Sequence, residues 1–503
     1  MTEKTRSQNA KRNILFGYIA QIGIFILSFI GRKIFLHYLS ADYLGINGLY
    51  TNILTILSLA ELGLDSAFLF SLYKPVAEHN YDLINSLITF FRKIYYSLAA
   101  ILLAAGLILT PFLKYLVRSD IAQKDLVFYY VVFLINMIST YFVAHKIALL
   151  SAFQEQRIQR LVTLLSNFTL QIAQIIVLIV FKDYHFYVIA STLTTIIFNC
   201  VLSIVAEKIH PEVFNARKDS VFDKQVIFKR IRATFMYKFG AVLINSTDNI
   251  LISALVGIYS VGLYSNYYSI VFSFTSLISI INAALITGIG NMAAKESRDK
   301  QQSLFDMMLL VYHLIAAIGF IGFSLLFNDL IPLWLGNKYL LDNATVFVIA
   351  LNFYLTYAIA PVWIFREANG LFDDVKYILL IRAAVNIALS IVLGMYFGVF
   401  GILLATTLSL ILTNFWYEPK VIAGKIFASK VSGYWVKQIR YCLLTVMSYL
   451  VCFFVIPNIG TGWIVLVIKA LAVCAITAFI FFLTNYKTPE YKKFKEYFVK
   501  KRS

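Results

Sequence analysis

Long apolar runs alternate with short polar stretches along nearly the whole chain. Each run is continuous, without the apolar/polar alternation of a barrel strand, and most are long enough for a membrane helix, which needs about 20 mostly apolar residues. Pro361 lies deep inside the tenth run and predicts a kink or hinge there. The fourteen predicted spans lie near 14–38, 44–73, 94–116, 126–150, 161–181, 186–206, 234–256, 261–294, 304–327, 344–366, 376–397, 399–416, 439–456 and 463–484.

The composition agrees with lipid as the solvent of this chain. Of 503 residues, 60% are hydrophobic and only 14% are charged, whereas a soluble protein carries about 25% charged residues. The mean hydropathy is +0.77. The first run follows Lys11 and Arg12 but lacks the short core and small-residue cleavage site of a signal peptide, so we expect it to stay as a span. The predicted fold class is an all-α polytopic membrane protein.

The basic residues predict how the chain is oriented. Of the 44 Lys and Arg residues, 34 fall in alternate loops and the two tails, 7 fall in the opposite loops, and 3 lie inside runs. Cytoplasmic loops are the ones enriched in Lys and Arg, so both termini are predicted to be cytoplasmic and the number of spans to be even. Twelve or thirteen spans remain possible if a run is wrongly split or joined. The net charge of +18 then reflects topology and anionic lipid headgroups, and nucleic acid is not an expected partner.

A short motif predicts two similar halves. GLYTN (Gly48–Asn52) and GLYSN (Gly262–Asn266) open the second and eighth runs, 214 residues apart. Six runs precede the basic stretch Glu207–Arg232 and eight follow it, which suits a parallel repeat about an axis along the membrane normal. We therefore predict two six-helix bundles related by a pseudo-two-fold, with two further helices at the end. The predicted parts are an N-terminal bundle 1–206, a basic cytoplasmic linker 207–233, a C-terminal bundle 234–416, and two extra helices with a basic tail 417–503.

Three carboxylates inside runs are candidates for ion coupling. Glu61 and Asp65 are four residues apart in the second run, so an uninterrupted helix would place them on one face. Asp248 lies in the polar cluster Asn245–Asn249 of the seventh run. A carboxylate at such depth normally faces a cavity or a partner and can bind H⁺ or Na⁺. Alternatively, Glu61 pairs with a basic neighbour, Asp65 lies near the cytoplasmic end, and the seventh-run cluster only joins helices by hydrogen bonds.

Four cations inside or beside runs are candidates for binding an anionic substrate. Arg32 and Lys33 interrupt the first run. They are interfacial anchors if the helix ends there, but at least one points into the bundle if the helix continues to Leu39. Arg366 and Arg382 lie at the end of the tenth run and inside the eleventh. The planar guanidinium fork of arginine can bond two phosphate oxygens at once.

Two stretches resemble a known family. YLGINGLYTNILTILSLAELGLDSAF (Tyr43–Phe68) is similar to the second-span region of bacterial polysaccharide-unit flippases, and NSTDNILISALVGIYSVGLYSNYYSI (Asn245–Ile270) to their seventh- and eighth-span region. These proteins belong to the multidrug/oligosaccharidyl-lipid/polysaccharide exporter superfamily. The resemblance implies a multi-pass protein of the bacterial cytoplasmic membrane with two bundles around a central cavity. Such a protein moves undecaprenyl-diphosphate-linked oligosaccharide to the outer leaflet for capsule, O-antigen or exopolysaccharide synthesis.

The resemblance also implies roles for particular residues. Arg32 and Lys33 would bind the diphosphate or anionic sugars, and Glu61 would couple transport to a cation gradient by alternating access. The chain departs from the pattern by having a basic pair in place of a single arginine. It also has two terminal spans, which leaves the path of the lipid tail open. Expected partners are the lipid-linked oligosaccharide, membrane lipids and other polysaccharide-assembly proteins.

Other functions stay as alternatives. A drug/cation antiporter or a peptidoglycan-precursor flippase of the same superfamily would differ in the charge of the cavity. A glycan polymerase or ligase is disfavoured because the outer loops are short and the largest, Asn328–Asn343, contains no His. The sequence has no metal-ligand cluster, so no cofactor is expected beyond H⁺ or Na⁺ as coupling ion, and we predict a non-enzyme. Four cysteines lie inside runs and predict no disulfide framework: Cys200, Cys442, Cys452 and Cys474.

Overall fold

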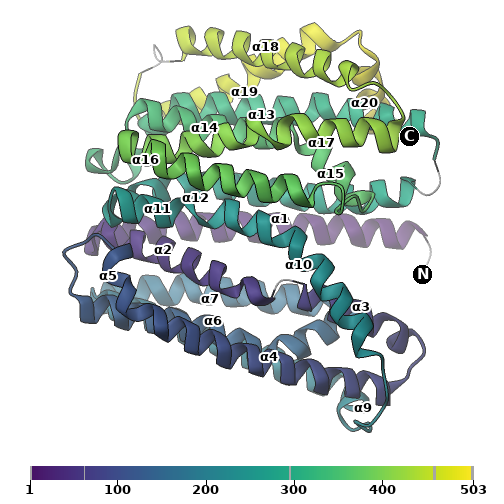
Figure 1. The fold of residues 1–503 in the computed structure, drawn as a ribbon. Coiled ribbons are helices and arrows are strands. Elements are labelled where there is room, and N and C mark those ends of the chain that lie inside the picture. The colour runs from purple at the N-terminus through teal and green to yellow at the C-terminus, as the bar shows by residue number, and fades with distance from the viewer. Residues whose placement is uncertain (1–2, 62, 294–295, 457–459, 500–503) are drawn as a thin grey trace. The chain divides into compact units, whose positions relative to one another are not determined.

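The structure, a computed structural model, describes residues 3–61, 63–293, 296–456 and 460–499. The secondary structure of these residues consists of helices joined by short loops, with no strand among them (Figure 1). The chain divides into two compact units, Met1–Gly262 (unit 1) and Leu263–Ser503 (unit 2). The all-helical fold class predicted from the sequence is confirmed.

Unit 1 is a helical bundle in which α6 packs against α4 and α8, and α7 packs against α1 and α8. Glycines bring α1 close to α7: Gly23 lies against the ring of Phe168 and Gly31 against the amide of Gln171. Such small residues let membrane helices approach each other closely. The elements are α1 (Glu3–Tyr38), α2 (Ala41–Leu57), η1 (Ser58–Glu61), α3 (Leu64–Ala77), α4 (Tyr81–Leu109), η2 (Thr110–Phe112), α5 (Leu113–Leu116), α6 (Gln123–Ala152), α7 (Gln156–Phe181), α8 (Tyr184–Ile209), α9 (Pro211–Phe214), α10 (Lys224–Ser246) and α11 (Asp248–Leu255).

Two predicted spans of unit 1 are broken helices. The second span was predicted to be continuous, but α2 gives way to the 3₁₀ turn η1, and α3 starts only at Leu64. Gly63 has φ +97°, a left-handed conformation that favours glycine and ends an α-helix. The prediction that Glu61 and Asp65 share one face of a continuous helix is therefore wrong. The seventh span is likewise interrupted at Thr247, between α10 and α11.

The motif glycine Gly262 lies where two helices cross. A Cβ atom on Gly262, at the start of α12, would overlap the backbone carbonyl of Ala41 in α2. A Cβ atom on Gly45, in the same turn of α2 as Gly48, would likewise overlap the backbone carbonyl of Ile258. Only glycine permits backbones to approach this closely. The motif residue Gly262 is therefore needed for packing within unit 1.

A substitution at this crossing tests its packing. Gly262→Ala should lower the free energy of unfolding by about 1–3 kcal/mol, because the added methyl forces α2 and α12 apart. Gly288 lies in the same helix with no heavy atom within 4 Å of an added Cβ. Gly288→Ala should therefore be neutral or stabilise by up to about 1 kcal/mol. Thermal unfolding of both purified variants in detergent measures the difference, and equal unfolding would contradict the crossing.

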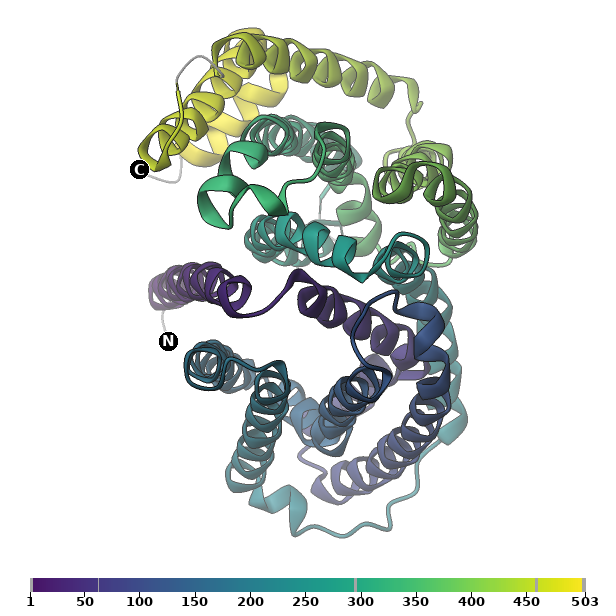
Figure 2. The ribbon, with the colours of Figure 1, turned by 90° about the vertical axis from the view of Figure 1, so that its left-hand side faces the viewer.

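The middle of the predicted linker, residues 215–223, is an ordered segment that we call the strap of unit 1. After α8 and α9 it runs along the end of the unit to the start of α10 (Figure 2). The side-chain amide of Asn85 donates to the carbonyl of Ala216 at 2.7 Å, and Asp82 and Ser86 accept from the backbone N–H groups of Arg217 and Ser220 at 2.8 and 3.0 Å. The first turns of α4 thus fix the strap. The predicted domain boundaries around it stay a prediction.

Unit 2 is built around α13, which packs against α14, α15, α18, α19 and α20. The first residues of α12, through Gly262, belong to unit 1. The elements are α12 (Ile258–Ala293), α13 (Arg298–Trp334), η3 (Asn337–Tyr339), α14 (Asn343–Ala358), α15 (Ala360–Ala368), α16 (Lys376–Leu412), α17 (Asn414–Ile422), η4 (Ala423–Phe427), α18 (Ser432–Val455), α19 (Trp463–Asn485) and α20 (Pro489–Val499).

Two bends in unit 2 follow from proline and glycine. The predicted kink in the tenth span is confirmed: α14 and α15 meet at an angle of 41°, with Pro361 in the first turn of α15. Proline cannot donate the backbone hydrogen bond that would continue α14. In α16, Gly398 has φ 57° and ψ −135°, a conformation that favours glycine. It lies in the one-residue gap between the predicted eleventh and twelfth runs.

Ion pairs anchor the C-terminal helices of unit 2. The ammonium of Lys437 in α18 lies 2.7 Å from Asp306 in α13 and 2.8 Å from Glu490 in α20. Burial, the largest single influence, acts to raise the pKa of Glu490, but the hydrogen bonds that its carboxylate accepts and the charge of Lys437 together lower it. Buried Lys469 in α19 pairs with Asp329 at 2.7 Å. The two extra helices predicted from the sequence are thus firmly attached to α13.

The helices identify a multi-pass membrane protein. Among the described residues, nine helices are long and apolar enough to cross a membrane, or ten if α14 and α15 form one bent span. One of the nine, Lys376–Phe427, contains both predicted runs on either side of Gly398. The exact count of fourteen spans and the location of the termini stay predictions. The four cysteines are free thiols, as the sequence predicted.

Candidate functional site

A polar pocket surrounds Arg32 inside the apolar helices of unit 1. Its volume is about 130 Å³, enough for several water molecules or a small polar group. Polar side chains from α1, α2, α7 and α8 contribute most of its lining. The lining residues are Ser28, Gly31, Arg32, Phe35, Leu44, Asn47, Gln171, Gln174, Ile175, Leu178 and Tyr187.

The local sequence explains how the pocket forms. Helix α1 continues without interruption to Tyr38, so Arg32 lies within the helix and its side chain is half-buried in the pocket. The neighbouring Gly31 leaves room for Gln171, whose amide oxygen would lie 3.4 Å from a Cβ at Gly31. Gln174 lies one turn further along α7 and reaches the same pocket.

The chemistry of the pocket suits an anion with hydrogen-bonding groups. Arg32 brings a permanent positive charge and interacts electrostatically with the hydroxyl of Tyr187. None of the described residues that line the pocket is acidic. The amides of Asn47, Gln171 and Gln174 add both donors and acceptors. A phosphate or carboxylate group could therefore be bound here with its oxygens satisfied.

Lys33 has a different environment. The next residue along a helix is turned by about 100°, and the Lys33 side chain is exposed and does not line the pocket. The sequence predicted that at least one of the pair would point into the bundle if the helix continued, and Arg32 does so. A role for Lys33 in substrate binding stays a prediction.

Glu61 and Asp65 come together around two buried tyrosines despite the broken helix. The Tyr95 hydroxyl in α4 donates to the Asp65 carboxylate. Tyr141 in α6 interacts electrostatically with both Glu61 and Asp65. Tyr95 and Tyr141 are almost fully buried, and their ring centroids lie 6.4 Å apart. Two carboxylates and two phenols at a broken helix form a group able to bind and release a proton.

Neutralising these carboxylates tests their predicted role in ion coupling. Glu61→Gln removes the charge and keeps the size of the side chain. If Glu61 binds the coupling ion, transport by this variant in the presence of an ion gradient should fall to the level that the wild type shows without a gradient. Substrate binding should be retained, because Glu61 does not line the Arg32 pocket. The rate of substrate transport across vesicle membranes, with and without an imposed H⁺ or Na⁺ gradient, measures this. A response to the gradient equal to that of the wild type would exclude Glu61 as the residue that binds the coupling ion.

Of the remaining predicted residues, Asp248 does not line the Arg32 pocket, and Arg366 and Arg382 belong to unit 2. Asp248 is the half-buried first residue of α11, while the Asn245 side chain lies outside the described part. Arg382 is half-buried on α16, one turn before Asn386, which is fully buried and donates to Thr406 at 3.1 Å. Their predicted roles stay predictions.

Arg366 lies in a buried ionic network at the end of α15. Its guanidinium lies 2.8 Å from the carboxylate of Glu418 in α17 and 3.3 Å from that of Glu367. Glu418 also accepts a hydrogen bond from Asn414. Arg366 is 6% exposed and Glu418 is 2% exposed. These contacts explain why an arginine is buried at this position. The predicted role of Arg366 in substrate binding stays a prediction.

Sequence reasoning missed the amides and phenols around the predicted charges. Gln171 and Gln174 are polar residues one turn apart inside an otherwise apolar run, which is a signal for a polar helix face within a membrane. Tyr95, Tyr141 and Tyr187 carried no such signal, because tyrosine is common in membrane helices as a packing or interfacial residue.

Comparison with known proteins shows which fold this is. No protein-family model matches the sequence, and no curated protein matches it either. The chain is similar in structure to the lipid II flippase MurJ in an inward closed conformation, with a TM-score of 0.69, 13% identity, and coverage of 94% of this chain and 100% of MurJ. It is also similar to an inward-facing multidrug resistance MATE family transporter of the MOP superfamily (TM-score 0.61, 13% identity, 80% and 98% coverage). A third similar structure is the MATE transporter VcmN of Vibrio cholerae (TM-score 0.56, 12% identity, 84% and 99% coverage). The chain therefore has the fold that the MurJ flippase and MATE transporters share.

Proposed function

We propose that this protein is a flippase that moves an undecaprenyl-diphosphate-linked oligosaccharide across the bacterial cytoplasmic membrane by alternating access. The observation that carries the proposal is the Arg32 pocket, a cationic and amide-lined cavity without acidic lining residues inside an apolar bundle. A sugar-diphosphate headgroup cannot cross hydrocarbon unaided, because burying charged and polar groups without partners is costly. Arg32 and the amides of Asn47, Gln171 and Gln174 offer such partners.

The likeness to solved structures supports a flippase over a drug antiporter. The lipid II flippase corresponds to 94% of this chain, and the two MATE transporters to 80% and 84%. All three are transporters by name, which favours transport over glycan polymerisation or ligation. A cationic drug would favour acidic pocket walls, whereas the described lining of this pocket carries a positive charge and no negative one.

A peptidoglycan-precursor flippase is the second candidate function. The observation in its favour is that the similar structure named as a flippase is one for lipid II. Such a substrate is also a lipid-linked sugar diphosphate, so the Arg32 pocket suits both. The two functions differ in the sugar that is moved, and the experiment must therefore separate the two lipid-linked pools.

We further propose that Glu61 and Asp65 couple transport to H⁺ or Na⁺. Their contacts with Tyr95 and Tyr141 keep both carboxylates in one polar group within unit 1. Coupling requires a group that binds the ion in one conformation and releases it in another. Lipid-linked oligosaccharide and membrane lipids are the proposed partners, along with other polysaccharide-assembly proteins, and both termini are proposed to be cytoplasmic.

The test measures lipid-linked glycans in cells that lack this protein and any redundant flippase. The inner- and outer-leaflet pools of oligosaccharide and of peptidoglycan precursor are separated with a reagent that cannot cross the membrane. We expect finished oligosaccharide units to accumulate in the inner leaflet and to be exported when the wild-type protein is restored. Accumulation of peptidoglycan precursor instead would favour the second function. Normal export of both would exclude a flippase role.

A further inference from the structure

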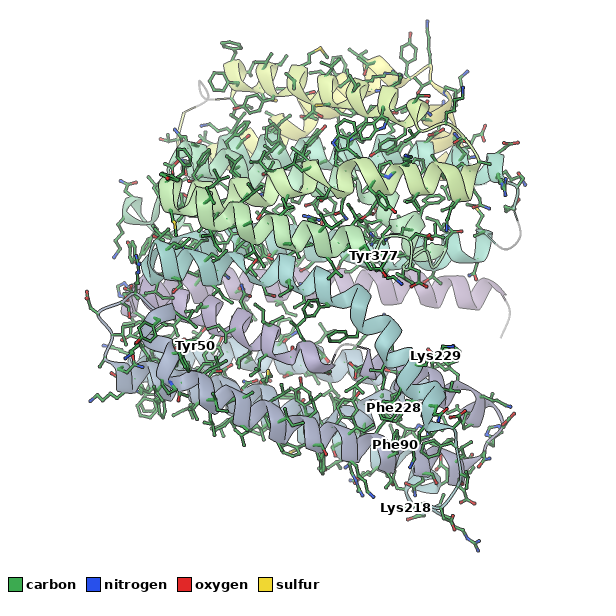
Figure 3. The ribbon with its side chains drawn as sticks, viewed as in Figure 1. Tyr50, Phe90, Lys218, Phe228, Lys229 and Tyr377 are labelled. Atoms are coloured by element: carbon green, nitrogen blue, oxygen red, sulfur yellow. The ribbon has the colours of Figure 1, made fainter. Side chains whose placement is uncertain are left out.

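The strap of unit 1 and the start of α10 carry an exposed surface that is both apolar and basic. We call it the linker surface, and it consists of Arg217, Lys218, Val221, Phe222, Lys224, Val226, Phe228 and Lys229, together with Phe90 of α4, beside which the rings of Phe222 and Phe228 lie. Figure 3 shows Phe90 and Phe228 at the same end of unit 1 as Lys218 and Lys229. Neither the proposed substrate pocket nor the carboxylate group includes any of these residues.

The apolar part of the linker surface is unusually exposed. The Val221 side chain is 97% exposed, Phe228 is 54% exposed and Val226 is 46% exposed. The rings of Phe222 and Phe228 lie 5.3 and 6.3 Å from that of Phe90. Apolar surface of this kind is unfavourable in water, and phenylalanine side chains beside basic ones are typical of segments that lie at the membrane interface.

The charged part of the surface is net positive. Arg217, Lys218, Lys224 and Lys229 are all exposed, and the Lys224 ammonium lies 5.6 Å from the ring centroid of Phe90. The nearby Asp223 caps the start of α10, where it accepts from the backbone N–H groups of Gln225 and Val226.

Asp82 and Asp219 also lie at this place. Asp82 accepts from the backbone of Arg217 and so helps to fix the strap. Asp219 is exposed. These four basic residues thus exceed the three aspartates, Asp82, Asp219 and Asp223, by one positive charge.

The surface has a fixed shape, because α4 fixes the strap through Asn85, Asp82 and Ser86. Ile227 is 4% exposed and anchors the first turns of α10, while its neighbours Val226 and Phe228 face outward. Basic and apolar side chains therefore stay side by side without an external partner. A flexible segment would instead have to lose conformational entropy on binding.

We propose that the linker surface binds the anionic phospholipid headgroups of the leaflet at this end of unit 1. Lys218, Lys224 and Lys229 contact headgroup phosphates, while Val221 and Phe228 insert beside the acyl chains. Lipid explains both features of the surface, since basic side chains favour anionic headgroups and aromatic side chains favour the interface. A nucleic acid would match the charge but would leave the exposed apolar side chains in water.

The test uses the full-length protein in lipid nanodiscs, with a fluorophore on Val221→Cys. Because the chain has cysteines of its own, the parent protein labelled in the same way supplies the background. Quenching by brominated phosphatidylglycerol and by brominated phosphatidylcholine is compared. We expect quenching by both lipids, with a preference for phosphatidylglycerol of about fivefold or more. Quenching by aqueous iodide but by neither lipid would overturn the proposal.

Charge reversal shows whether the lysines cause the preference. The double variant Lys218→Glu/Lys229→Glu should reduce the preference for phosphatidylglycerol to about none, and both side chains are exposed, so folding should be unaffected. Lys114→Glu, in α5 at the other end of unit 1, is the matched control and should keep the preference. An unchanged preference in the double variant would overturn the proposal. The proposal would also be overturned if an acidic peptide or an oligonucleotide protected the fluorophore on Val221→Cys from iodide quenching better than phosphatidylglycerol does.

Discussion

Replacing Arg32 by Ala should reduce transport of lipid-linked oligosaccharide about 10- to 100-fold. A hydrogen bond to a charged group contributes about 1.5–3 kcal/mol, and each 1.4 kcal/mol is a factor of ten. Arg32 provides the positive charge of its pocket, so no other lining residue can replace it. Transport is measured as the initial rate of appearance of glycan in the outer leaflet, after correction for the amount of protein in the membrane.

Two further variants define what the pocket requires. Arg32→Lys keeps the charge but loses the planar fork, so we expect an intermediate loss of transport. Gly31→Val leaves the charge in place and narrows the pocket where Gln171 lies against Gly31, so transport should fall although Arg32 is present. Lys33→Ala is the matched comparison on the next residue. Full activity of Lys33→Ala would assign the role to Arg32 alone, whereas an equal loss would support the basic pair.

The transport rate of Arg32→Ala is interpreted together with its thermal stability. If Arg32→Ala has wild-type transport and wild-type thermal stability, the pocket is not part of the substrate path. If the variant loses transport only because it unfolds, the stability measurement shows this. The transport rate of Gly31→Val then decides whether the pocket is part of the substrate path.

Replacing Arg366 by Met should lower the free energy of unfolding by about 3–5 kcal/mol. The substitution leaves the Glu418 carboxylate buried without the guanidinium that lies 2.8 Å from it, and an uncompensated buried charge is costly. The double variant Arg366→Met/Glu418→Met removes both charges and should recover most of the stability. Thermal and chemical unfolding of the purified proteins measure the difference.

The matched control is an exposed ion pair in the same unit. Lys376 pairs with Asp373 at 3.0 Å, and the Asp373 side chain is 91% exposed. Lys376→Met should therefore cost no more than about 1 kcal/mol. Equal effects of the two single substitutions would contradict a structural role of the Arg366 pair.

The same double variant decides between the two roles of Arg366. If it is stable and transports normally, Arg366 serves the structure of unit 2. If it is stable and inactive, the sequence-based prediction of substrate binding is supported.

Much of the fold could be predicted because membrane helices need long apolar runs. The gap that separates two predicted runs coincides with Gly398, where α16 bends. The bend near Pro361 could be predicted because proline lacks a backbone donor. The break at Gly63 was missed because a single glycine in an apolar run is a weak signal, and its positive φ is seen only in the folded structure.

The charges of the candidate site could be predicted, but their neighbours could not. Arg32 and Glu61 are conspicuous inside apolar runs, since lipid does not tolerate them. Gln171 reaches Arg32 only because α7 packs on α1 at Gly31, and Glu418 reaches Arg366 across 52 residues. Contacts between helices far apart in sequence depend on tertiary packing, which one sequence does not reveal.

Reconstitution tests the central claim most directly. Purified protein is inserted into vesicles that contain undecaprenyl-diphosphate-linked oligosaccharide in both leaflets, and an impermeant reagent modifies the glycan that is reached from outside. We predict that wild-type protein makes the inner-leaflet glycan accessible as well, and that Arg32→Ala does so about 10- to 100-fold more slowly. If vesicles with wild-type protein expose no more glycan than protein-free vesicles, with and without an ion gradient, the flippase account is wrong.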